Sequence, residues 1–226
     1  MLALKQALSL VSSKDTWQPD DESGIEAWFR YKRLITFDDE FGAVSSWGDS
    51  MSGSMIMGQT DTDEQPTYSL GAITFDSSSY PQNLQLEDAA QISLTDDFTI
   101  ALRINMLSAG GVILGDNTTV GEFIKYTTAS QMRIKIDNSS IDISLDSGTF
   151  GDDYLVITRS DNLITLWKNG VAQADTETLA GTSDIDTIGV RRIDLNPLDA
   201  AIKDIQIYST ESSQLTANIN DYLSLL

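Results

Sequence analysis

Two short apolar runs, residues 154–159 and 163–168, form the clearest hydrophobic pattern in the chain. Both runs are rich in Leu, Val, Ile, Thr and Trp, and the polar trio Ser160-Asp161-Asn162 separates them. This spacing predicts a β-hairpin. Asn169-Gly170 follows, and this dipeptide favours a type I′ turn into a further strand over residues 171–174. Because the first run is apolar on both faces, we expect its strand to lie inside a sandwich rather than on a one-sided sheet.

Short apolar or alternating segments recur along residues 25–208, with turn residues between them. The longest is 98–106, in which Phe98, Ile100, Leu102 and Ile104 share one face. The other predicted strands are 27–31, 44–49, 72–75, 84–86, 112–114, 123–126, 132–136, 141–145, 185–189 and 201–208. Residues 50–58, rich in Ser, Gly and Met, are predicted to form a loop. No strand alternates with a long helix, so the pattern favours an all-β sandwich.

Helical spacing occurs at the two ends of the chain. Near the N-terminus it involves Leu4, Leu8 and Val11. This segment has one cation, an interrupted apolar run and no A-x-A site after it. These features favour a short docking helix over a secretion signal. At the C-terminus, an apolar stripe predicts a helix that packs back on the sandwich; it consists of Leu215, Ile219, Tyr222, Leu223 and Leu226, with Ser212 or Ser213 as the N-cap.

These patterns divide the chain into two parts. Residues 1–24 are interpreted as an N-terminal helical anchor followed by an acidic linker, and residues 25–226 as one β-sandwich domain that includes the C-terminal helix. The stripe Leu4, Leu8 and Val11 is too short to be stable as an isolated helix in water, so we expect it to dock on a surface. The acidic linker favours a partner over the sandwich itself as that surface.

Charge and missing residue types exclude several functions. The 226-residue chain has 14 Lys and Arg against 34 Asp and Glu, a net charge of −20, which disfavours nucleic acids and anionic membranes as partners. Cysteine and histidine are absent, so disulfides, thiol chemistry, His- or Cys-based zinc sites and His-based triads are excluded. No run of 18 apolar residues predicts membrane insertion.

Several short motifs, in this order and spacing, resemble the laminin-G-like, concanavalin A-like jelly roll found in many bacterial and bacteriophage proteins. They include Trp28-Phe29, residues 44–50, residues 65–68, Phe98-Thr99-Ile100, residues 113–116, residues 166–170, Asn196-Pro197 and residues 201–208. The resemblance implies two antiparallel sheets, with ligands at the concave face or the rim loops. Residues 1–13 also resemble the opening of jelly-roll structural proteins of tailed phages, especially marine ones.

The rim loops and two aromatic residues supply the candidate ligand-binding residues. Asp49, Asp116 and Asn117 could hold calcium, the one cofactor that the sequence suggests, or could simply form turns. Trp47 and Trp167 could stack on sugar rings, or could pack in the core. For Asp49, Asp116, Asn117 and Trp167 we favour the structural role, and for Trp47 both roles stay open.

Enzymatic activity is not expected. A glycosidase needs only two carboxylates, so it is the enzyme class that the composition leaves open. Glucanases with a related sandwich resemble one another in a Glu-x-Asp-x-x-Glu strand, and this sequence has no such motif. The pairs Asp184/Asp186 and Asp142/Asp146 place carboxylates on one side of a strand, but no general base accompanies them.

The resemblance therefore implies a structural protein of a bacteriophage virion: a capsid decoration, head-fibre or tail-associated subunit made in the host cytoplasm. Its expected partners are other virion proteins or copies of itself, together with surface glycans. The alternative is a bacterial carbohydrate-binding module or adhesin, and a glycosidase is the distant third. Fold alone does not choose among these classes.

Overall fold

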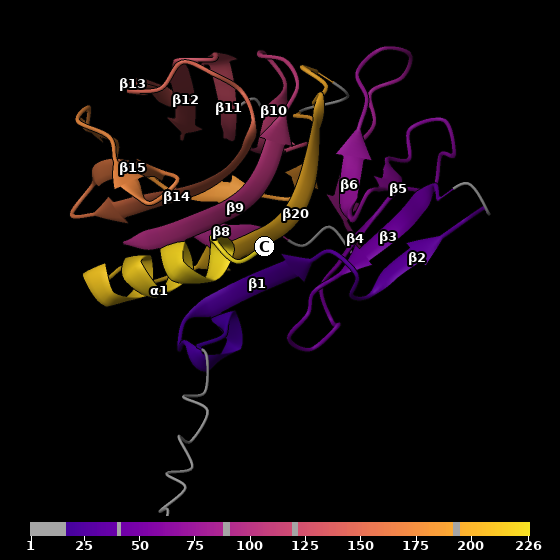
Figure 1. The fold of residues 1–226 in the computed structure, drawn as a ribbon, viewed down its shortest axis with the longest axis horizontal. Coiled ribbons are helices and arrows are strands. Elements are labelled where there is room, and N and C mark those ends of the chain that lie inside the picture. The colour runs from indigo at the N-terminus through magenta and orange to yellow at the C-terminus, as the bar shows by residue number, and fades with distance from the viewer. Residues whose placement is uncertain (1–16, 40–41, 88–90, 119–121, 192–194) are drawn as a thin grey trace, which may run out of the picture.

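Short strands make up most of the computed structural model, which describes residues 17–39, 42–87, 91–118, 122–191 and 195–226 (Figure 1). Sheet A consists of β1 (Ile25–Arg30), β5 (Thr67–Ser69), β6 (Ala72–Phe75), β9 (Phe98–Met106), β14 (Asp152–Ser160), β15 (Leu163–Lys168), β16 (Val171–Ala172), β17 (Glu177–Thr178) and β20 (Ala200–Tyr208). Sheet B consists of β2 (Ile35–Phe37), β3 (Val44–Gly48), β4 (Ile56–Gly58), β7 (Leu84–Leu86), β10 (Val112–Gly115), β11 (Phe123–Thr128), β12 (Gln131–Ile136), β13 (Ser139–Ser144) and β19 (Thr187–Ile188). The remaining elements are the paired strands β8 (Ile92–Leu94) and β18 (Ser183–Ile185), the 3₁₀ turn η1 (Pro19–Asp21) and the helix α1 (Ser213–Leu223).

The two large sheets are antiparallel and pack face to face. Sheet A has the strand order β16-β15-β14-β9-β20-β6-β5, with β1 also beside β20 and β17 beside β15. Sheet B has the order β13-β12-β11-β10-β19-β7-β4-β3-β2. The predicted all-β sandwich is thereby confirmed, whereas its finer assignment to the concanavalin A-like jelly roll stays a prediction.

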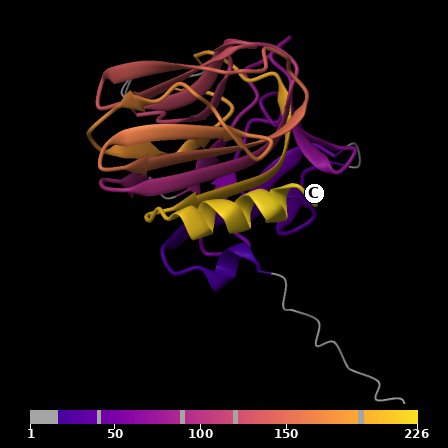
Figure 2. The ribbon, with the colours of Figure 1, turned by 60° about the vertical axis from the view of Figure 1, so that its left-hand side comes forward.

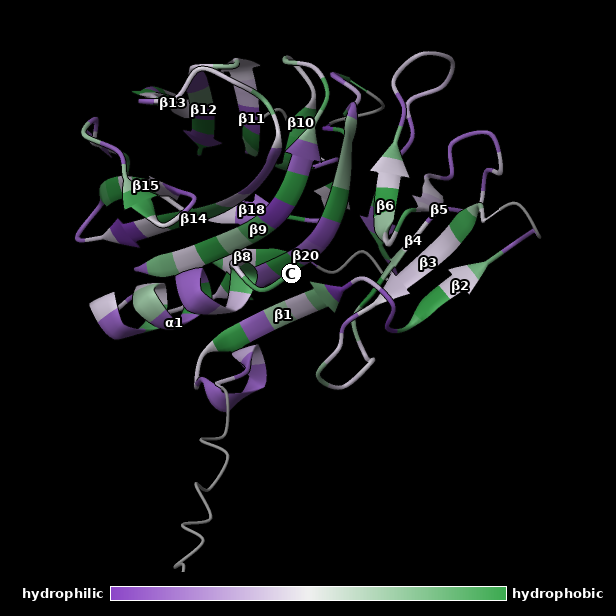
Figure 3. Ribbon diagram, viewed as in Figure 1, coloured by the Kyte–Doolittle hydropathy of each residue, from purple (hydrophilic) through white to green (hydrophobic). Residues whose placement is uncertain are grey.

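The main core lies between the sheets and follows the alternation of the strands. Figure 3 shows hydrophobic and hydrophilic bands along β9 and β20. The core includes the four residues that the sequence placed on one face of the longest predicted strand, Phe98, Ile100, Leu102 and Ile104, together with Leu155, Ile157, Ile205 and Ile207. Each is almost fully buried, so the period-two pattern placed these side chains correctly.

The hairpin of β14 and β15 is confirmed, with a tighter turn than the sequence suggested. Asp161 and Asn162 both have positive φ, 50° and 68°, so the turn has two residues rather than three. Asn169 and Gly170 also have positive φ, 53° and 77°, as a type I′ turn requires. The strand that follows is β16, which is only two residues long.

A second apolar cluster covers the outer face of sheet A. The helix α1 lies along this face (Figure 2), and its Leu215 and Ile219 pack against Trp28 and Val156. Ser212 is its N-cap, with the side-chain oxygen accepting a hydrogen bond from the Leu215 amide at 3.0 Å. Thus β14 is covered by sheet B on one side and by α1 on the other, as its two apolar faces indicated. None of the described helices has the length and hydrophobicity needed to cross a membrane.

Part of the predicted linker lies on the sandwich. The Trp17 ring packs edge-on against Tyr222 of α1, with 6.2 Å between ring centroids, and η1 follows directly. Trp17 thus contacts the domain, whereas the division of the chain into an anchor with its acidic linker and one sandwich domain stays a prediction. The predicted docking residues Leu4, Leu8 and Val11 lie outside the described residues. Docking, virion attachment and virion partners accordingly stay predictions.

Two strand predictions were wrong. The predicted loop over residues 50–58 contains β4, and Met57 of this strand is fully buried in the core. The Ser and Gly residues around β4 do not favour a strand. The strand forms because β4 pairs with β3 and β7, which are distant in the sequence or separated from it by a loop. The single strand expected over residues 185–189 is instead divided between β18 and β19, which pair in different sheets.

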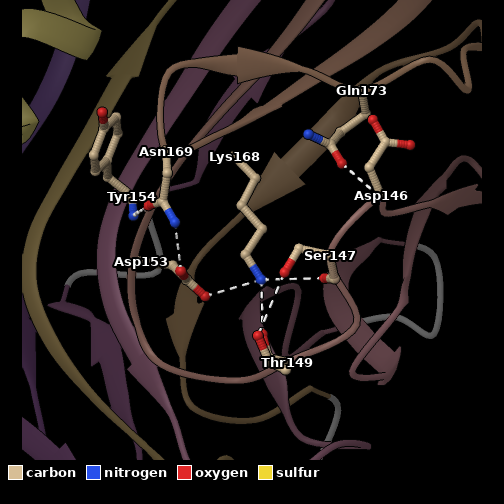
Figure 4. A network of polar contacts seen from close by, with 8 residues as sticks. All are labelled: Asp146, Ser147, Thr149, Asp153, Tyr154, Lys168, Asn169 and Gln173. Carbon is tan, nitrogen blue, oxygen red and sulfur yellow. Dashed lines mark hydrogen bonds and ion pairs between the residues drawn. The ribbon is translucent and has the colours of Figure 1, made fainter.

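A buried lysine, the last residue of β15, lies within a network of polar contacts (Figure 4). The Lys168 ammonium lies 3.0 Å from the Asp153 carboxylate and donates to the Thr149 carbonyl at 2.8 Å. The Asn169 side chain joins the same network, donating to Asp153 at 2.7 Å and accepting from the Tyr154 amide at 2.9 Å. These contacts fasten the loop after β13 to the β14–β15 hairpin.

We expect Lys168→Met to lower the free energy of unfolding by about 3–5 kcal/mol, because it leaves a largely buried carboxylate without its cation. The matched control is Lys203→Met. Lys203 pairs with Asp152, whose side chain is 45% exposed, at 3.2 Å, so its loss should cost less than about 1 kcal/mol. Urea unfolding of both variants checks the prediction, and equal losses would contradict it.

A buried polar chain lies between sheet A and α1. Tyr208 donates to Gln206 at 2.8 Å, and Gln206 donates to Asp204 at 2.7 Å. The Trp28 indole donates to the other oxygen of Asp204 at 3.1 Å. Burial raises the pKa of Asp204 to about 7, although the bonds from Gln206 and Trp28 and the charge of Arg30 oppose this rise.

This raised pKa predicts a pH dependence of stability. Between about pH 4 and pH 7 the folded state keeps the Asp204 proton, whereas the unfolded state loses it. The contribution of the protonated group is therefore complete below about pH 4 and is lost as the pH rises towards 7. We expect Asp204→Asn to have a flatter dependence of the unfolding free energy on pH over this range. Parallel curves for the two proteins would show that Asp204 does not titrate there.

Candidate functional site

Trp47 is a core residue. Its ring is fully buried, lies 5.7 Å from the Phe29 ring centroid, and its indole nitrogen donates to the Arg30 carbonyl at 3.1 Å. No face of the ring is open to a sugar, so of the two roles that the sequence left open for Trp47 the structure supports core packing.

Asp49 organises a turn. Its carboxylate is buried and accepts hydrogen bonds from the backbone amides of Trp28 at 2.9 Å, Ser52 at 3.2 Å and Met51 at 3.3 Å. With these partners the side chain joins the loop after β3 to β1. It therefore has the turn-forming role rather than that of an open ligand group.

Asp116 and Asn117 lie in the turn after β10, beside other carboxyl groups. Asp116 is buried and accepts from the Thr118 amide at 2.7 Å, and the Asn117 amide donates to Asp186 at 2.7 Å. Burial, and then a hydrogen bond with Asp116, raise the pKa of Glu122 to about 7. Across the described residues no cluster of three or more acidic side chains is arranged to hold a metal. The calcium hypothesis thus gains no support from this turn.

Trp167 lies on the other side of the molecule, on the outer face of sheet A. It is half-buried against the α1 cluster and borders a hollow of about 410 Å³ that Thr216 and Asn220 also line. The structure therefore does not bring the five predicted ligand residues together. Trp47 and Asp49 have structural roles in the core and in a turn. Asp116 and Asn117 lie in one turn of sheet B, and Trp167 lies on the outer face of sheet A, away from the other four residues.

The outer face of sheet B has a feature that the sequence did not reveal. A continuous row of paired residues crosses all nine strands on this face; in order it is Thr36, Ser46, Gly58, Gln85, Thr187, Gly115, Phe123, Lys135 and Ser140. The residues next to them in the strands, such as Met57 and Leu84, point into the core. Small side chains dominate the β2–β7 half of the row.

A hollow of about 580 Å³ lies over this half of the row, and we call it the sheet-B hollow. Ser46, Gly58 and Gln85 line it on adjacent strands, and Glu87 borders it. A Cβ atom on Gly58 would come within 2.6 Å of the Glu87 carboxylate, so this carboxylate lies directly over the glycine.

Three side chains that line the sheet-B hollow are available to a ligand. Ser46, Gln85 and Glu87 make no side-chain hydrogen bond to any residue within the described ranges. Asp38 at the rim is different, because it accepts from Gln65 at 2.5 Å. One hydroxyl, one carboxamide and one carboxylate together offer both donors and acceptors at a partly recessed surface.

The sequence matches no family model and none of the curated proteins. The structure is similar to Trypanosoma rangeli sialidase in complex with sialic acid, with a TM-score of 0.57, 13% identity, and coverage of 89% of this chain and 33% of that one. It is also similar to the receptor-binding domain of botulinum neurotoxin type G, with a TM-score of 0.51, 14% identity, and coverage of 90% and 51%. The chain therefore spans about a third of the sialidase and half of the toxin domain. At these identities the likeness shows a shared β-sandwich fold.

Proposed function

We propose that this chain is a carbohydrate-binding β-sandwich module that contacts its glycan in the sheet-B hollow. The observation that carries the proposal is the gathering of Ser46, Gln85 and Glu87, without side-chain hydrogen-bond partners in the described chain, around Gly58 in the sheet-B hollow. Sugar hydroxyls both donate and accept hydrogen bonds, so a mixed set of hydroxyl, amide and carboxylate groups suits them.

The structural neighbours support the same class. One is a sialidase solved with a sugar acid, and the other is a receptor-binding domain of a toxin. Their likeness to this chain lies in the sandwich, and the site must be argued from its own residues. Helix α1 covers β9 and β14 on the outer face of sheet A, whereas neither of the described helices lies on the outer face of sheet B.

We expect Gln85→Ala to weaken glycan binding about tenfold, since it removes a carboxamide that bonds the sugar and about 1.4 kcal/mol corresponds to that factor. The measurement is a glycan array followed by calorimetric titration of the best ligand. Gln214→Ala is the matched control, because Gln214 is an exposed carboxamide on α1, far from sheet B in the fold. A ligand that binds Gln85→Ala and wild type equally would place the site elsewhere.

We further propose that the module binds glycans without hydrolysing them. The sheet-B hollow has two carboxylates at its rim, Asp38 and Glu87, and both residues are exposed. A general acid at neutral pH needs a pKa raised by burial or by a close negative neighbour. We therefore expect no release of reducing ends from any glycan that the array identifies. Hydrolysis that disappears in Glu87→Gln would overturn this proposal.

A further inference from the structure

A group of cations occupies the β10–β13 half of the outer face of sheet B. Lys125 on β11 and Arg133 on β12 are register partners, so their side chains lie together on this face. Arg191 reaches the same place from the segment after β19, which passes over Gly115: a Cβ there would lie 2.8 Å from the Val190 carbonyl. Three cations at one spot are notable in a chain with a net charge of −20.

Phe123 forms the base of this group. The Arg191 guanidinium carbon lies 4.7 Å from the Phe123 ring centroid, and the Lys125 ammonium lies 5.3 Å from it. The ring is 6% exposed although it is on the outer face of the sheet, because these side chains cover it. Asn196 accepts from the Arg191 Nε atom at 3.0 Å and so fixes the direction of the guanidinium group.

Most of the positive charge in this group is not neutralised by the protein. Arg133 forms a two-bond ion pair with Asp142, at 2.6 Å for each bond. Within the described chain, Lys125 and Arg191 have no carboxylate within ion-pair distance. Burial lowers the pKa of Lys125, and the charges of Arg191 and Arg133 lower it further, so the cations repel one another. Such an arrangement favours the arrival of a negative group.

We propose that Lys125 and Arg191, with Arg133 beside them and Phe123 beneath, form a binding site for an anionic substituent of a sugar, either a carboxylate or a sulfate ester. Guanidinium and ammonium groups both make strong charge-assisted hydrogen bonds to such oxygens. The net charge of −20 repels polyanions at long range, so the site suits a glycan with isolated charges rather than nucleic acid.

The position of the site connects it with the sheet-B hollow. Phe123 and Gln85 belong to the same cross-strand row, with Gly115 and Thr187 between them. Three strand spacings separate them, roughly 14 Å at ~4.8 Å per strand. A short oligosaccharide can therefore place neutral rings at the hollow and an acidic ring at the cations. The identity of the ligand as a sugar rests on the proposed function, whereas the anion site itself does not.

The test is an NMR titration with methyl glucuronide, glucose 6-sulfate and methyl glucoside, which differ in the anionic group. For wild type we expect the two anionic sugars to bind at least tenfold more tightly than the neutral one, with the largest shifts at Phe123 and Lys125. Lys125→Gln/Arg191→Gln should lose this preference, and the charge-conserving Lys125→Arg/Arg191→Lys should keep most of it.

The control variant is Lys32→Gln/Arg33→Gln, which removes the same charge from the β1–β2 connection and should bind like wild type. Equal binding of neutral and anionic sugars, or an unchanged preference in Lys125→Gln/Arg191→Gln, would overturn the proposal. Tighter binding of inorganic sulfate than of either anionic sugar would overturn its sugar component. Binding lost in Gln85→Ala alone would concern the sheet-B hollow and leave the anion site intact, so the two proposals fail separately.

Discussion

The pairing of β20 is the constraint on which sheet A depends. One edge of β20 pairs with β9 along the whole strand, from Ala200 to Tyr208. The other edge is shared, since Ala200–Ile202 pairs with β6 and the part from Asp204 onward pairs with β1. Strands near the start of the chain therefore find their place only when nearly the last strand is present. Contacts over such sequence separations cost loop-closure entropy, and they favour slow, cooperative folding.

A shift of register within β20 decides what lies on each side of sheet A. The irregularity falls between Ile202 and Asp204, and both Ile202 and Ile205 consequently point into the main core. Asp204 then faces outward with Gln206 and Tyr208, where the chain would carry exposed polar groups if α1 did not cover them. Asp204, Gln206 and Tyr208 each have a side-chain hydrogen-bond partner. The face of sheet A beneath α1 therefore keeps a specific polar arrangement rather than a purely apolar one.

The position of α1 over sheet A also explains why the proposed ligand surfaces lie on sheet B. Helix α1 and the Trp17 segment occupy the outer face of sheet A. On sheet B, the β2–β7 half offers Ser46 and Gln85 around a glycine, and the other half offers Lys125 and Arg191 over Phe123. One face thus combines groups suited to hydroxyls with groups suited to an anion, on a protein that otherwise repels negative charge.

The sequence alone indicated the features that depend on neighbouring residues: the alternation along β9, the location of the turns at Asn162 and Asn169, and a serine cap, Ser212 or Ser213, at the start of α1. It did not reveal β4, because the burial of Met57 comes from strands distant in the chain. Nor could it unite Ser46, Gly58 and Gln85, or bring Arg191 over Phe123. Those groupings depend on strand register, which side-chain alternation along one strand cannot define, because register is a relation between strands.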